Sequence, residues 1–235
     1  MPTLRVVGPG RAGTALTRAL AAVPTWTVLD PVRHRDDVSG AARDVDVLVI
    51  ATPDDAVASV AAAVRPVDAT VVAHLAGSLG LEVLAPHRRR ASIHPLRSIT
   101  LAGADLRGAW FAVAGDPIAA RVVDDLEGHH VEVDDAHRAA YHAAACIASN
   151  HLVALLGQVE RVAATAGVPL EAYLDLVRQT VENVAALGPA AALTGPVRRG
   201  DTATVERHLD ALDAFDPSER GAYEALADAA RKLVA

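Results

Sequence analysis

The sequence contains few cysteine, lysine and aromatic residues. Cys146 and Lys232 are the only residues of their types, and aromatic residues make up 3% of the 235. A single cysteine excludes a disulfide within the chain and is typical of a reducing compartment. Because Lys232 lies at the C-terminal end of the sequence, a Schiff-base lysine is not expected. No cysteine pair and no recognised histidine spacing indicates zinc, so no metal site is expected.

A shortage of positive charge excludes further classes of partner. The sequence has 22 basic and 29 acidic residues, a net charge of −7. Nucleic acids and anionic membranes require a basic face, so neither is expected as a partner. The longest apolar stretch, His142–Val159, carries polar side chains and is short for a membrane span. The first residues lead into a strand pattern and not a secretion signal. We therefore expect a soluble, cytoplasmic protein.

Apolar residues are abundant, at 51% of the sequence, which is enough for a large buried core. Up to about residue 134, short β-branched runs alternate with alanine-rich helical stretches. This pattern predicts a doubly wound α/β sheet with right-handed crossovers. The predicted strands are Leu4–Val7, Thr25–Leu29, Val45–Ile50, Thr70–His74, Ala91–His94, Ala109–Ala114 and His130–Val133. Since only helical patterns follow, we predict a Rossmann-type dinucleotide-binding domain over residues 1–134. A smaller all-α domain for substrate binding and dimerisation is predicted over residues 135–235.

The segment between the first predicted strand and helix has the pattern G-x-G-x-x-G. It consists of Gly8, Pro9, Gly10, Arg11, Ala12 and Gly13. Between a strand and a helix, this pattern is typical of a dinucleotide-binding loop. Gly8 allows a tight turn, Gly10 lets a pyrophosphate approach the backbone, and Gly13 lets helix and strand pack closely. The free N–H groups of the helix then bind the phosphates, and Arg11 adds a positive charge.

Two signals after the second predicted strand point to different cofactors. Asp30 suits the ribose hydroxyls of NAD. The basic run Arg33, His34 and Arg35 instead suits the 2′-phosphate of NADP. Because Asp30 precedes Pro31 and suits a turn, we favour Arg33 and NADP, with NAD as the alternative. Solvated arginines without a ligand are the remaining interpretation.

Polar residues end the next strands. Thr52 and Pro53 follow the third strand, and we assign both to the cofactor site because ligands bind beyond the carboxyl ends of parallel strands. His74 ends the fourth strand and His94 the fifth. We assign His74 to the cofactor site and His94 to proton transfer, because an imidazole with a pKa of ~6.5 exchanges protons near neutral pH. Structural histidines are the alternative interpretation.

A long helix predicted from Asp135, as its cap, to about Ala166 carries Tyr141, His142 and Asn150. His142 and Asn150 lie eight residues apart and share one helical face, with small residues between them. That face has room for a ligand, so we assign Tyr141 to substrate binding and His142 and Asn150 to catalysis. Close helix packing is the alternative.

Further along, Thr194 and Arg199 lie in a loop bounded by glycine and proline. We assign both to substrate binding, since a guanidinium can clamp a carboxylate through two hydrogen bonds. Alternatively, Asp201 caps the following helix and the arginines remain in solvent.

Together these motifs resemble the Rossmann-like oxidoreductases with a C-terminal helical domain of unknown function, within the phosphogluconate dehydrogenase-like group. The resemblance is carried by Val7–Gly13, Ala51–Asp55, His74–Gly80, Ser92–Leu96, Tyr141–Leu152, Ala192–Asp201 and Thr204–Leu209. It implies NAD(P)-dependent redox chemistry and a homodimer. Some relatives resemble an alternative ketopantoate reductase.

The resemblance also bears on single residues. Related prephenate dehydrogenases have a catalytic histidine in a His-Pro motif like His94-Pro95. Many β-hydroxyacid dehydrogenases use a lysine and an asparagine four residues apart on the long interdomain helix. This chain has Asn150 but has Cys146 at the lysine position, which shifts proton transfer to His94 or His142.

The sequence therefore predicts an NADP-dependent dehydrogenase or reductase. Its substrate is expected to be a small oxo or hydroxy acid that accepts or gives a hydride. The alternative is a non-catalytic NAD(P)-binding sensor or interaction protein, which keeps the glycine loop but needs no proton donor.

Overall fold

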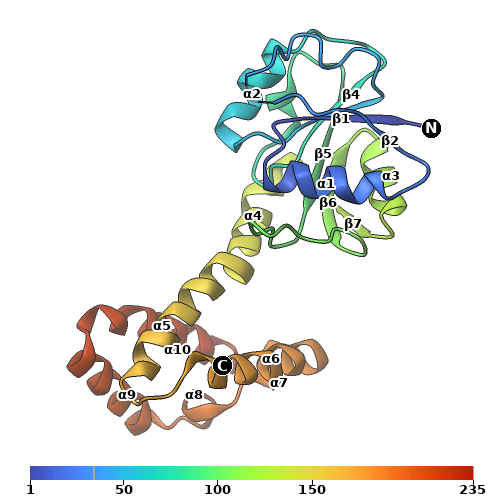
Figure 1. Ribbon diagram of the computed structural model, residues 1–235. Coiled ribbons are helices and arrows are strands. Elements are labelled where there is room, and N and C mark those ends of the chain that lie inside the picture. Colours follow the sequence, from blue (N-terminus) through green and yellow to red (C-terminus); the bar gives the residue numbers. More distant parts are fainter. Residues whose placement is uncertain (34, 235) are drawn as a thin grey trace. The chain divides into compact units, whose positions relative to one another are not determined.

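The computed structural model describes residues 1–33 and 35–234, so His34 of the basic run lies outside the described residues. The chain forms two compact units, Met1–Ser149 and Asn150–Ala235 (Figure 1). The sequence places its domain boundary at residue 134, where the strand pattern ends. In the structure, the helix after the last strand contacts the sheet through Tyr141 and His94 and belongs to the first unit up to Ser149.

The first unit contains a seven-stranded sheet in the order β2-β1-β3-β4-β5-β6-β7. Its strands are β1 (Thr3–Val7), β2 (Thr27–Val28), β3 (Val47–Ile50), β4 (Val71–His74), β5 (Arg89–Pro95), β6 (Trp110–Gly115) and β7 (His129–Glu132). Neighbouring strands are parallel except β5 and β6, which are antiparallel. All seven predicted strands are present, and the predicted α/β fold of the Rossmann type is confirmed.

The sequence pattern did not predict the reversed direction of β6. The described connection 96–109, between β5 and β6, contains no helix. Parallel neighbours need a long crossover that is usually helical, whereas antiparallel neighbours can be joined by a loop. Without a crossover helix, β6 therefore returns alongside β5. The pairing sets Ala114 beside Ser92 and Ala112 beside His94, which leaves space around these polar side chains.

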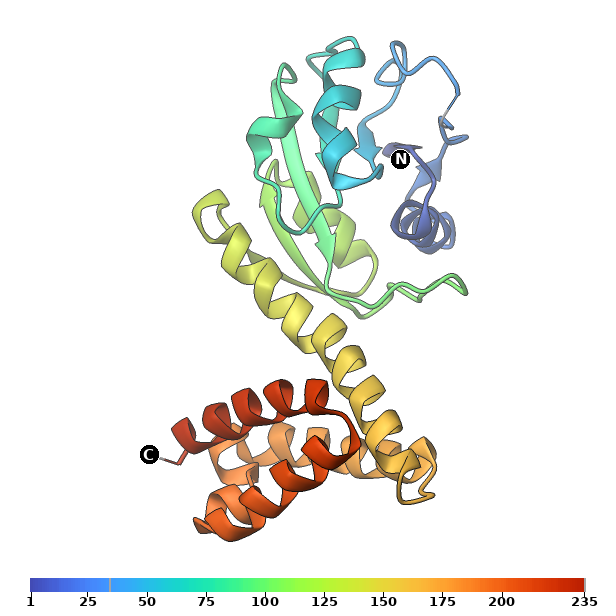
Figure 2. The same ribbon diagram turned by 90° about the vertical axis from the view of Figure 1, so that its left-hand side faces the viewer.

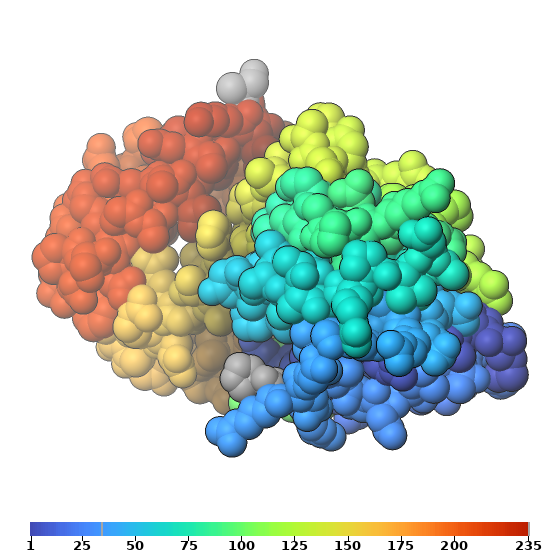
Figure 3. Space-filling view, turned by 90° about the horizontal axis from the view of Figure 1, so that it is seen from above, coloured from blue at the N-terminus to red at the C-terminus, as the bar shows by residue number. Residues whose placement is uncertain are grey.

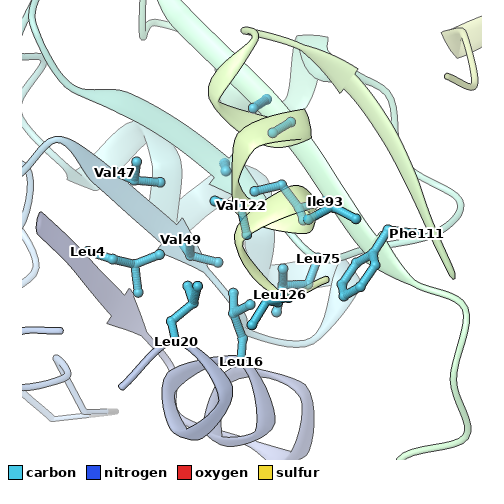
Figure 4. Close-up of a cluster of buried hydrophobic side chains, with 14 of the residues drawn as sticks. Leu4, Leu16, Leu20, Val47, Val49, Leu75, Ile93, Phe111, Val122 and Leu126 are labelled. Atoms are coloured by element: carbon cyan, nitrogen blue, oxygen red, sulfur yellow. The ribbon is translucent and has the colours of Figure 1, made fainter. Parts of the chain in front are cut away.

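The strands bury apolar side chains on both faces of the sheet. One face packs against α1 (Arg11–Ala21) and α3 (Ile118–Asp125), and Figure 4 shows the leucines, valines and Phe111 that fill this layer. The other face packs against α2 (Asp54–Ala63) and the turn η1 (Leu81–Leu84). β3 is buried along its whole length, as expected for a strand covered on both sides.

Three polar side chains share the α2 face of the sheet. Side chains alternate between the two faces along a strand. Val72, two residues before His74 on β4, packs in the α2 layer. His74 pairs in register with Ser92 on β5, and His94 follows two residues later. His74, Ser92 and His94 therefore project from the same face, opposite α1 and α3.

One helical segment, Asp135–Ala164, begins after the last strand. It comprises η2 (Asp135–His137), α4 (Arg138–Cys146), the π-helical turn η3 (Ile147–His151) and α5 (Leu152–Ala164). The predicted cap is wrong by one residue. Asp134 accepts the N–H of His137 at 3.0 Å, whereas Asp135 accepts the N–H of Leu81 at 3.0 Å.

By length and composition alone, this helical segment could cross a membrane, with a mean hydropathy of 1.3 over its most apolar window. A single helix of this kind is weak evidence for a membrane span, because the core helix of a soluble protein passes the same test.

The second unit consists of helices and connecting segments (Figure 2, yellow to red). After α5 it contains α6 (Leu170–Leu187), α7 (Pro189–Ala192), α8 (Gly195–Arg199), α9 (Thr202–Phe215), η4 (Pro217–Glu219) and α10 (Arg220–Lys232). Asp201 caps α9 by accepting the N–H of Thr204 at 3.1 Å. None of the 18 residues described in α6 is buried.

Candidate functional site

Two glycines shape the loop between β1 and α1. Gly8 has a φ of +77°, and a Cβ at this position would lie 2.7 Å from Cγ2 of Thr52. A Cβ on Gly13 would lie 2.9 Å from Cβ of Ala51 and 3.0 Å from Cγ1 of Val6. A side chain at either position would therefore push α1 away from the strands. Gly8 makes the turn, and Gly13 permits the close packing of helix and strand.

The N-terminus of α1 is open to a ligand. Gly10 is the residue that precedes the helix, and no side chain in the described part of the chain caps it. The first N–H groups of a helix have no partner within the helix and carry partial positive charge. A Cβ on Gly10 would have a single atom within 4 Å, the carbonyl oxygen of Ala51 at 3.9 Å. The loop therefore has donors and space for a phosphate.

Two adjoining cavities flank this loop and together form what we call the groove. The cavity of about 440 Å³ is lined by Val7, Gly8, Pro9, Gly10, Arg33, Val38, Ala51, Thr52, Pro53 and Val60. The cavity of about 360 Å³ is lined by Gly10, Arg11, Ala12, Ala51, Thr52, Pro53, Leu75, His94, Pro95, Arg97 and Ile99. Because the cavities share residues of the loops after β1 and β3, the groove runs from Arg33 to His94 along the carboxyl edge of the sheet.

Arg33 and Asp30 differ in their position relative to the groove. Arg33 lines it, whereas Asp30 is exposed and lines neither cavity. The N–H of Arg33 donates to Oδ2 of Asp36 at 2.7 Å, which fixes the turn that carries it. This segment, in lighter blue, lies at the surface in Figure 3. A guanidinium at this end of the groove suits a phosphate better than a ribose hydroxyl.

Thr52 and Pro53 line both cavities, at the middle of the groove. Oγ1 of Thr52 is buried and has no hydrogen-bond partner among the described residues. Buried polar atoms are nearly always paired, so this hydroxyl has a hydrogen bond to offer. The uncapped N-terminus of α1, the Thr52 hydroxyl and the guanidinium of Arg33 at the end of the groove together fit a dinucleotide.

His74 holds its own loop. Its Nδ1 accepts the N–H of Ala76 at 3.2 Å, so the neutral ring carries its proton on Nε2 and donates to the carbonyl of Gly80 at 3.3 Å. Burial lowers the pKa of His74 to about 4, which keeps the ring neutral. His74 lines neither cavity. The structure therefore gives this residue a structural role in place of the predicted cofactor contact.

His94 lines the groove and also contacts α4. Its Nδ1 lies 2.6 Å from the hydroxyl oxygen of Tyr141, and the two rings meet edge to face. Its Nε2 has no hydrogen-bond partner among the described residues. Burial, reinforced by the charges of His142 and Arg138, lowers the pKa of His94 to about 4. The expected pKa of ~6.5 is therefore wrong, because burial disfavours the cationic ring.

His142, the residue after Tyr141 on α4, also lies beside His94. The ring centroids are 5.9 Å apart, and Nε2 of His142 lies 3.6 Å from Sγ of Cys146. A Cβ on Gly77 would meet Nδ1 of His142 at 2.5 Å and Nε2 of His94 at 2.9 Å. Both imidazoles therefore converge on a backbone position that only glycine leaves open.

Arg138, the first residue of α4, is 1% exposed. Its three guanidinium nitrogens are buried and have no hydrogen-bond partner among the described residues. Oγ of Ser92 on β5 and Nδ1 of His142 are also buried and unpartnered there. We call Ser92, His94, Arg138, Tyr141 and His142 the His94 cluster. The charge of Asp135 favours the cationic form of Arg138. Because buried charges are normally hydrogen-bonded as well, a guanidinium without such a partner among the described residues needs an explanation.

The positive charge of Arg138 reaches the other groups of the cluster. It lowers the pKa of His94, after burial and His142. Burial raises the pKa of Tyr141, and the Arg138 charge opposes that rise. The Tyr141 hydroxyl therefore keeps its proton at neutral pH beside a charge that favours its anionic form.

Asp54 connects α2 to the cluster. The hydroxyl of Ser78 donates to Oδ2 of Asp54 at 3.1 Å, and no side chain in the described residues caps α2. This carboxylate therefore holds the loop after β4 and does not cap the helix that it begins. Its negative charge raises the pKa of His94, against the larger effect of burial.

The other predicted residues lie in the second unit. Asn150 lies in the π-helical turn η3, a geometry that is frequent at functional sites. Thr194 and Arg199 are exposed at the start and end of α8. Because Asp201 caps α9, the structure has the capping arrangement that the sequence allowed as the alternative for this loop.

Sequence reasoning missed three residues of the site. Arg97 and Ile99 line the groove beside His94. Their position directly after the His-Pro motif at the end of β5 was the available signal. Arg138 gave no signal, because an arginine at a helix start is usually exposed. Within the described residues, no group of three or more His, Cys, Asp and Glu side chains is placed to hold a metal ion.

Residues 111–230, about half of the chain, match the model of DUF2520, a domain of unknown function. The chain belongs to the DUF2520 family. The resemblance to a family with a C-terminal domain of unknown function is thereby confirmed, with the matched region beginning in β6 of the first unit. The relationship to ketopantoate reductases stays a prediction. No curated protein matches this DUF2520 protein.

Several solved structures share its fold. A protein of Bacteroides fragilis, provisionally assigned as an NADP oxidoreductase, is 18% identical, with a TM-score of 0.79 and 98% of each chain covered. A protein of Thermotoga maritima is 23% identical, with a TM-score of 0.75 and the same coverage. Pyrroline carboxylate reductase of Plasmodium falciparum, solved with NADP bound, is 14% identical, with a TM-score of 0.63 over 100% of this chain and 98% of that chain.

Proposed function

We propose that this DUF2520 protein is an NADP-dependent oxidoreductase that transfers a hydride to or from a small oxo or hydroxy acid. One observation carries the proposal. A single groove joins the open N-terminus of α1, the guanidinium of Arg33 and the imidazole of His94. The helix N-terminus suits a pyrophosphate, the guanidinium suits a 2′-phosphate, and the imidazole suits proton transfer at a carbonyl.

NADP is the proposed cofactor, with NAD as the alternative. The amides of residues 11–13 would bind the pyrophosphate, Thr52 and Pro53 would line its path, and Arg33 would hold the 2′-phosphate. When bound, the reduced cofactor supplies a hydride. The P. falciparum reductase of the same fold, solved with NADP bound, supports this choice.

His94 and Arg97 support an oxo acid as substrate. They line the same cavity of about 360 Å³. An oxo acid can place its carboxylate against a guanidinium and its carbonyl oxygen against Nε2 of His94, the ring nitrogen without a partner among the described residues. Tyr141 and His142 hold His94 in place from α4. Asn150, Thr194 and Arg199 remain further candidates for substrate contacts.

Binding and turnover can be tested separately. Titration with NADPH and NADH measures dinucleotide affinity, and a panel of 2-oxo acids is screened by loss of NADPH absorbance. We expect saturable NADPH binding and turnover of at least one acid. His94→Ala should lower kcat by ~10²–10⁴-fold with NADPH affinity retained. His208→Ala, a histidine variant of the second unit, is the matched control and should behave as wild type.

The same experiment distinguishes the oxidoreductase from the alternative, non-catalytic function. Saturable binding with no turnover of any acid would favour a non-catalytic sensor or interaction protein. The position of Cys146, where related dehydrogenases carry a lysine, favours that alternative. No binding of either dinucleotide would overturn both functions.

We further propose a soluble, cytoplasmic homodimer that binds neither nucleic acid nor membranes. α6 presents Leu176, Val181 and Leu187 to solvent, each more than half exposed. Apolar surface of this kind is typical of an association face. Analytical ultracentrifugation should give a dimer, and Leu176→Glu with Leu187→Glu should give a monomer. A monomeric wild-type chain would contradict the dimer.

A further inference from the structure

The low pKa of His94 raises a question about proton transfer that the proposed function leaves open. With a pKa of about 4, only about one ring in a thousand is cationic at pH 7. A neutral imidazole that gave up its Nε2 proton alone would become an imidazolate, an anion far too basic to form in a buried site. The ring can donate only if Nδ1 gains a proton as Nε2 loses one.

Tyr141 is placed to supply that proton. Its hydroxyl oxygen lies 2.6 Å from Nδ1 of His94, within the range of a strong O–H donor. Burial raises the pKa of Tyr141, so the phenol is protonated at neutral pH. The phenol would become anionic as it protonates His94, and an isolated phenolate is costly in a buried site.

Arg138 offers the compensating charge. It lies one turn before Tyr141 on α4, fully buried, with three unpartnered guanidinium nitrogens among the described residues. A buried cation without a hydrogen-bonded partner destabilises the resting protein. This destabilisation is explained if Arg138 pairs with an anion that forms only during the reaction.

We propose that Tyr141, His94 and Arg138 form a proton relay, which rests on the proposed function. As the substrate oxygen becomes an alkoxide, the Nε2–H bond of His94 breaks and a new O–H bond forms on the substrate. The O–H bond of Tyr141 breaks and an Nδ1–H bond forms on His94. The ring stays neutral throughout, and the positive charge of Arg138 stabilises the phenolate. Afterwards a proton from solvent binds Nε2 of His94 and the Nδ1 proton returns to the Tyr141 oxygen, which restores the resting state of both groups. Arg138 is a positioning residue in this scheme, because it acts through Tyr141.

The direction of the hydrogen bond gives a test that needs neither substrate nor cofactor. In protein labelled with ¹⁵N-histidine, nitrogen NMR at pH 7 distinguishes the two neutral forms of the ring. The relay requires the proton of His94 on Nε2 and an acceptor at Nδ1. Tyr141→Phe should shift the Nδ1 resonance by removing its donor. A proton on Nδ1 in wild type would reverse the bond and overturn the relay.

A matched pair of residues provides the control. His208 and Tyr223, in the second unit, have an Nδ1-to-hydroxyl distance of 2.7 Å and edge-to-face rings. His208 is exposed, whereas His94 is half-buried. Tyr223→Phe should leave the His94 resonances and the turnover unchanged. A response of His94 to this variant would show that the tyrosine effect is not local and would count against the relay.

The role of Arg138 is tested by stability and titration together. Arg138→Met removes a buried charge that has no hydrogen-bonded partner among the described residues and that only the nearby charge of Asp135 favours, so the variant should be at least as thermostable as wild type. In ¹³C-tyrosine spectra the pKa of Tyr141 should rise, while Arg138→Lys should keep it closer to wild type. His94 should titrate at higher pH in Arg138→Met, although His142, Tyr141, Asp54 and His74 also face it. An unchanged Tyr141 titration would overturn the role of Arg138.

Turnover gives the last readout once a substrate is known. Tyr141→Phe and Arg138→Met should each lower kcat about 10- to 100-fold, with the KM for NADPH unchanged and partial rescue in Arg138→Lys. Full activity of Tyr141→Phe would overturn the relay and leave the proposed function intact. If no acid is reduced by wild-type protein, the proposed function fails, while the NMR result on the bond direction still stands.

Discussion

The glycine loop and the His94 cluster lie at the same edge of the sheet, yet they are built from different parts of the chain. The loop is six consecutive residues, Gly8–Gly13, and its properties come from backbone. The cluster draws its side chains from β5 and α4, and its properties come from buried ionisable groups. The loop is sensitive to added volume, and the cluster is sensitive to charge and pH. The following variants test this difference, in order of expected effect.

Gly13→Val should have the largest effect on stability. Its Cβ would meet Ala51, Val6 and the Gly8 carbonyl at 2.9–3.1 Å, which forces α1 from the strands. We expect a loss of ~3 kcal/mol or more in the free energy of unfolding, measured in urea. Gly10→Ala is the matched control, since its Cβ would have one contact, at 3.9 Å. It should lose under ~1 kcal/mol while NADPH affinity falls at least ~10-fold. Equal stability of the two variants would contradict this account of the loop.

His74→Ala should destabilise more than His94→Ala. His74 is fully buried and bonds both ends of its loop, at Ala76 and Gly80, whereas His94 has one bonded nitrogen and lines the groove. We expect a loss of ~2–4 kcal/mol for His74→Ala, from the cavity and two unpaired backbone groups. Urea unfolding at pH 7 measures both variants. A larger loss of stability in His94→Ala than in His74→Ala would contradict a structural role for His74 and a reactive role for His94.

Acid should destabilise the protein through both histidines. Each has a folded-state pKa of about 4 against ~6.5 in the unfolded chain. Between these values the unfolded chain binds protons that the folded state does not, so stability falls as pH decreases from ~6.5 to ~4. The slope should reach up to ~1.4 kcal/mol per pH unit for each histidine. His94→Gln should remove one of the two slopes in urea unfolding between pH 7 and 5. An unchanged slope would mean that His94 is cationic in the folded protein.

Arg33→Ala should have the smallest effect and act on one cofactor. Arg33 is exposed and lines the end of the groove, so its loss should leave stability within ~0.5 kcal/mol. NADPH affinity should fall about 10-fold, and NADH affinity should remain unchanged. Calorimetric titration of both cofactors measures this. An equal loss of affinity for both cofactors would show that Arg33 does not bind the 2′-phosphate.

The glycine loop and the strands could be predicted because their signals are local. A G-x-G-x-x-G pattern after an apolar run specifies a turn and a helix start within a dozen residues. The reversed β6 could not be predicted in this way. Its direction depends on the absence of a helix between residues 96 and 109 and on which strand edge is free when the chain returns.

The cluster was predicted in part. His94, Tyr141 and His142 were singled out by their positions at a strand end and on a helix. Their protonation states were not predicted, because a pKa depends on burial and on charges that come from other elements. The sequence places both His74 and His94 at strand ends and assigns both to the site, and the folded loop 75–80 makes His74 structural because it uses both ring nitrogens.

Local patterns in the sequence determined the Rossmann-type sheet, the glycine turn before α1 and the helical second half, since each depends on the periodicity and conformational freedom of neighbouring residues. Only the tertiary structure decided which polar groups meet, and in what protonation state. Arg138 shows why: nothing in its sequence context marks it as buried. Packing of α4 against the sheet takes its charge out of water and sets it beside Tyr141 and His94.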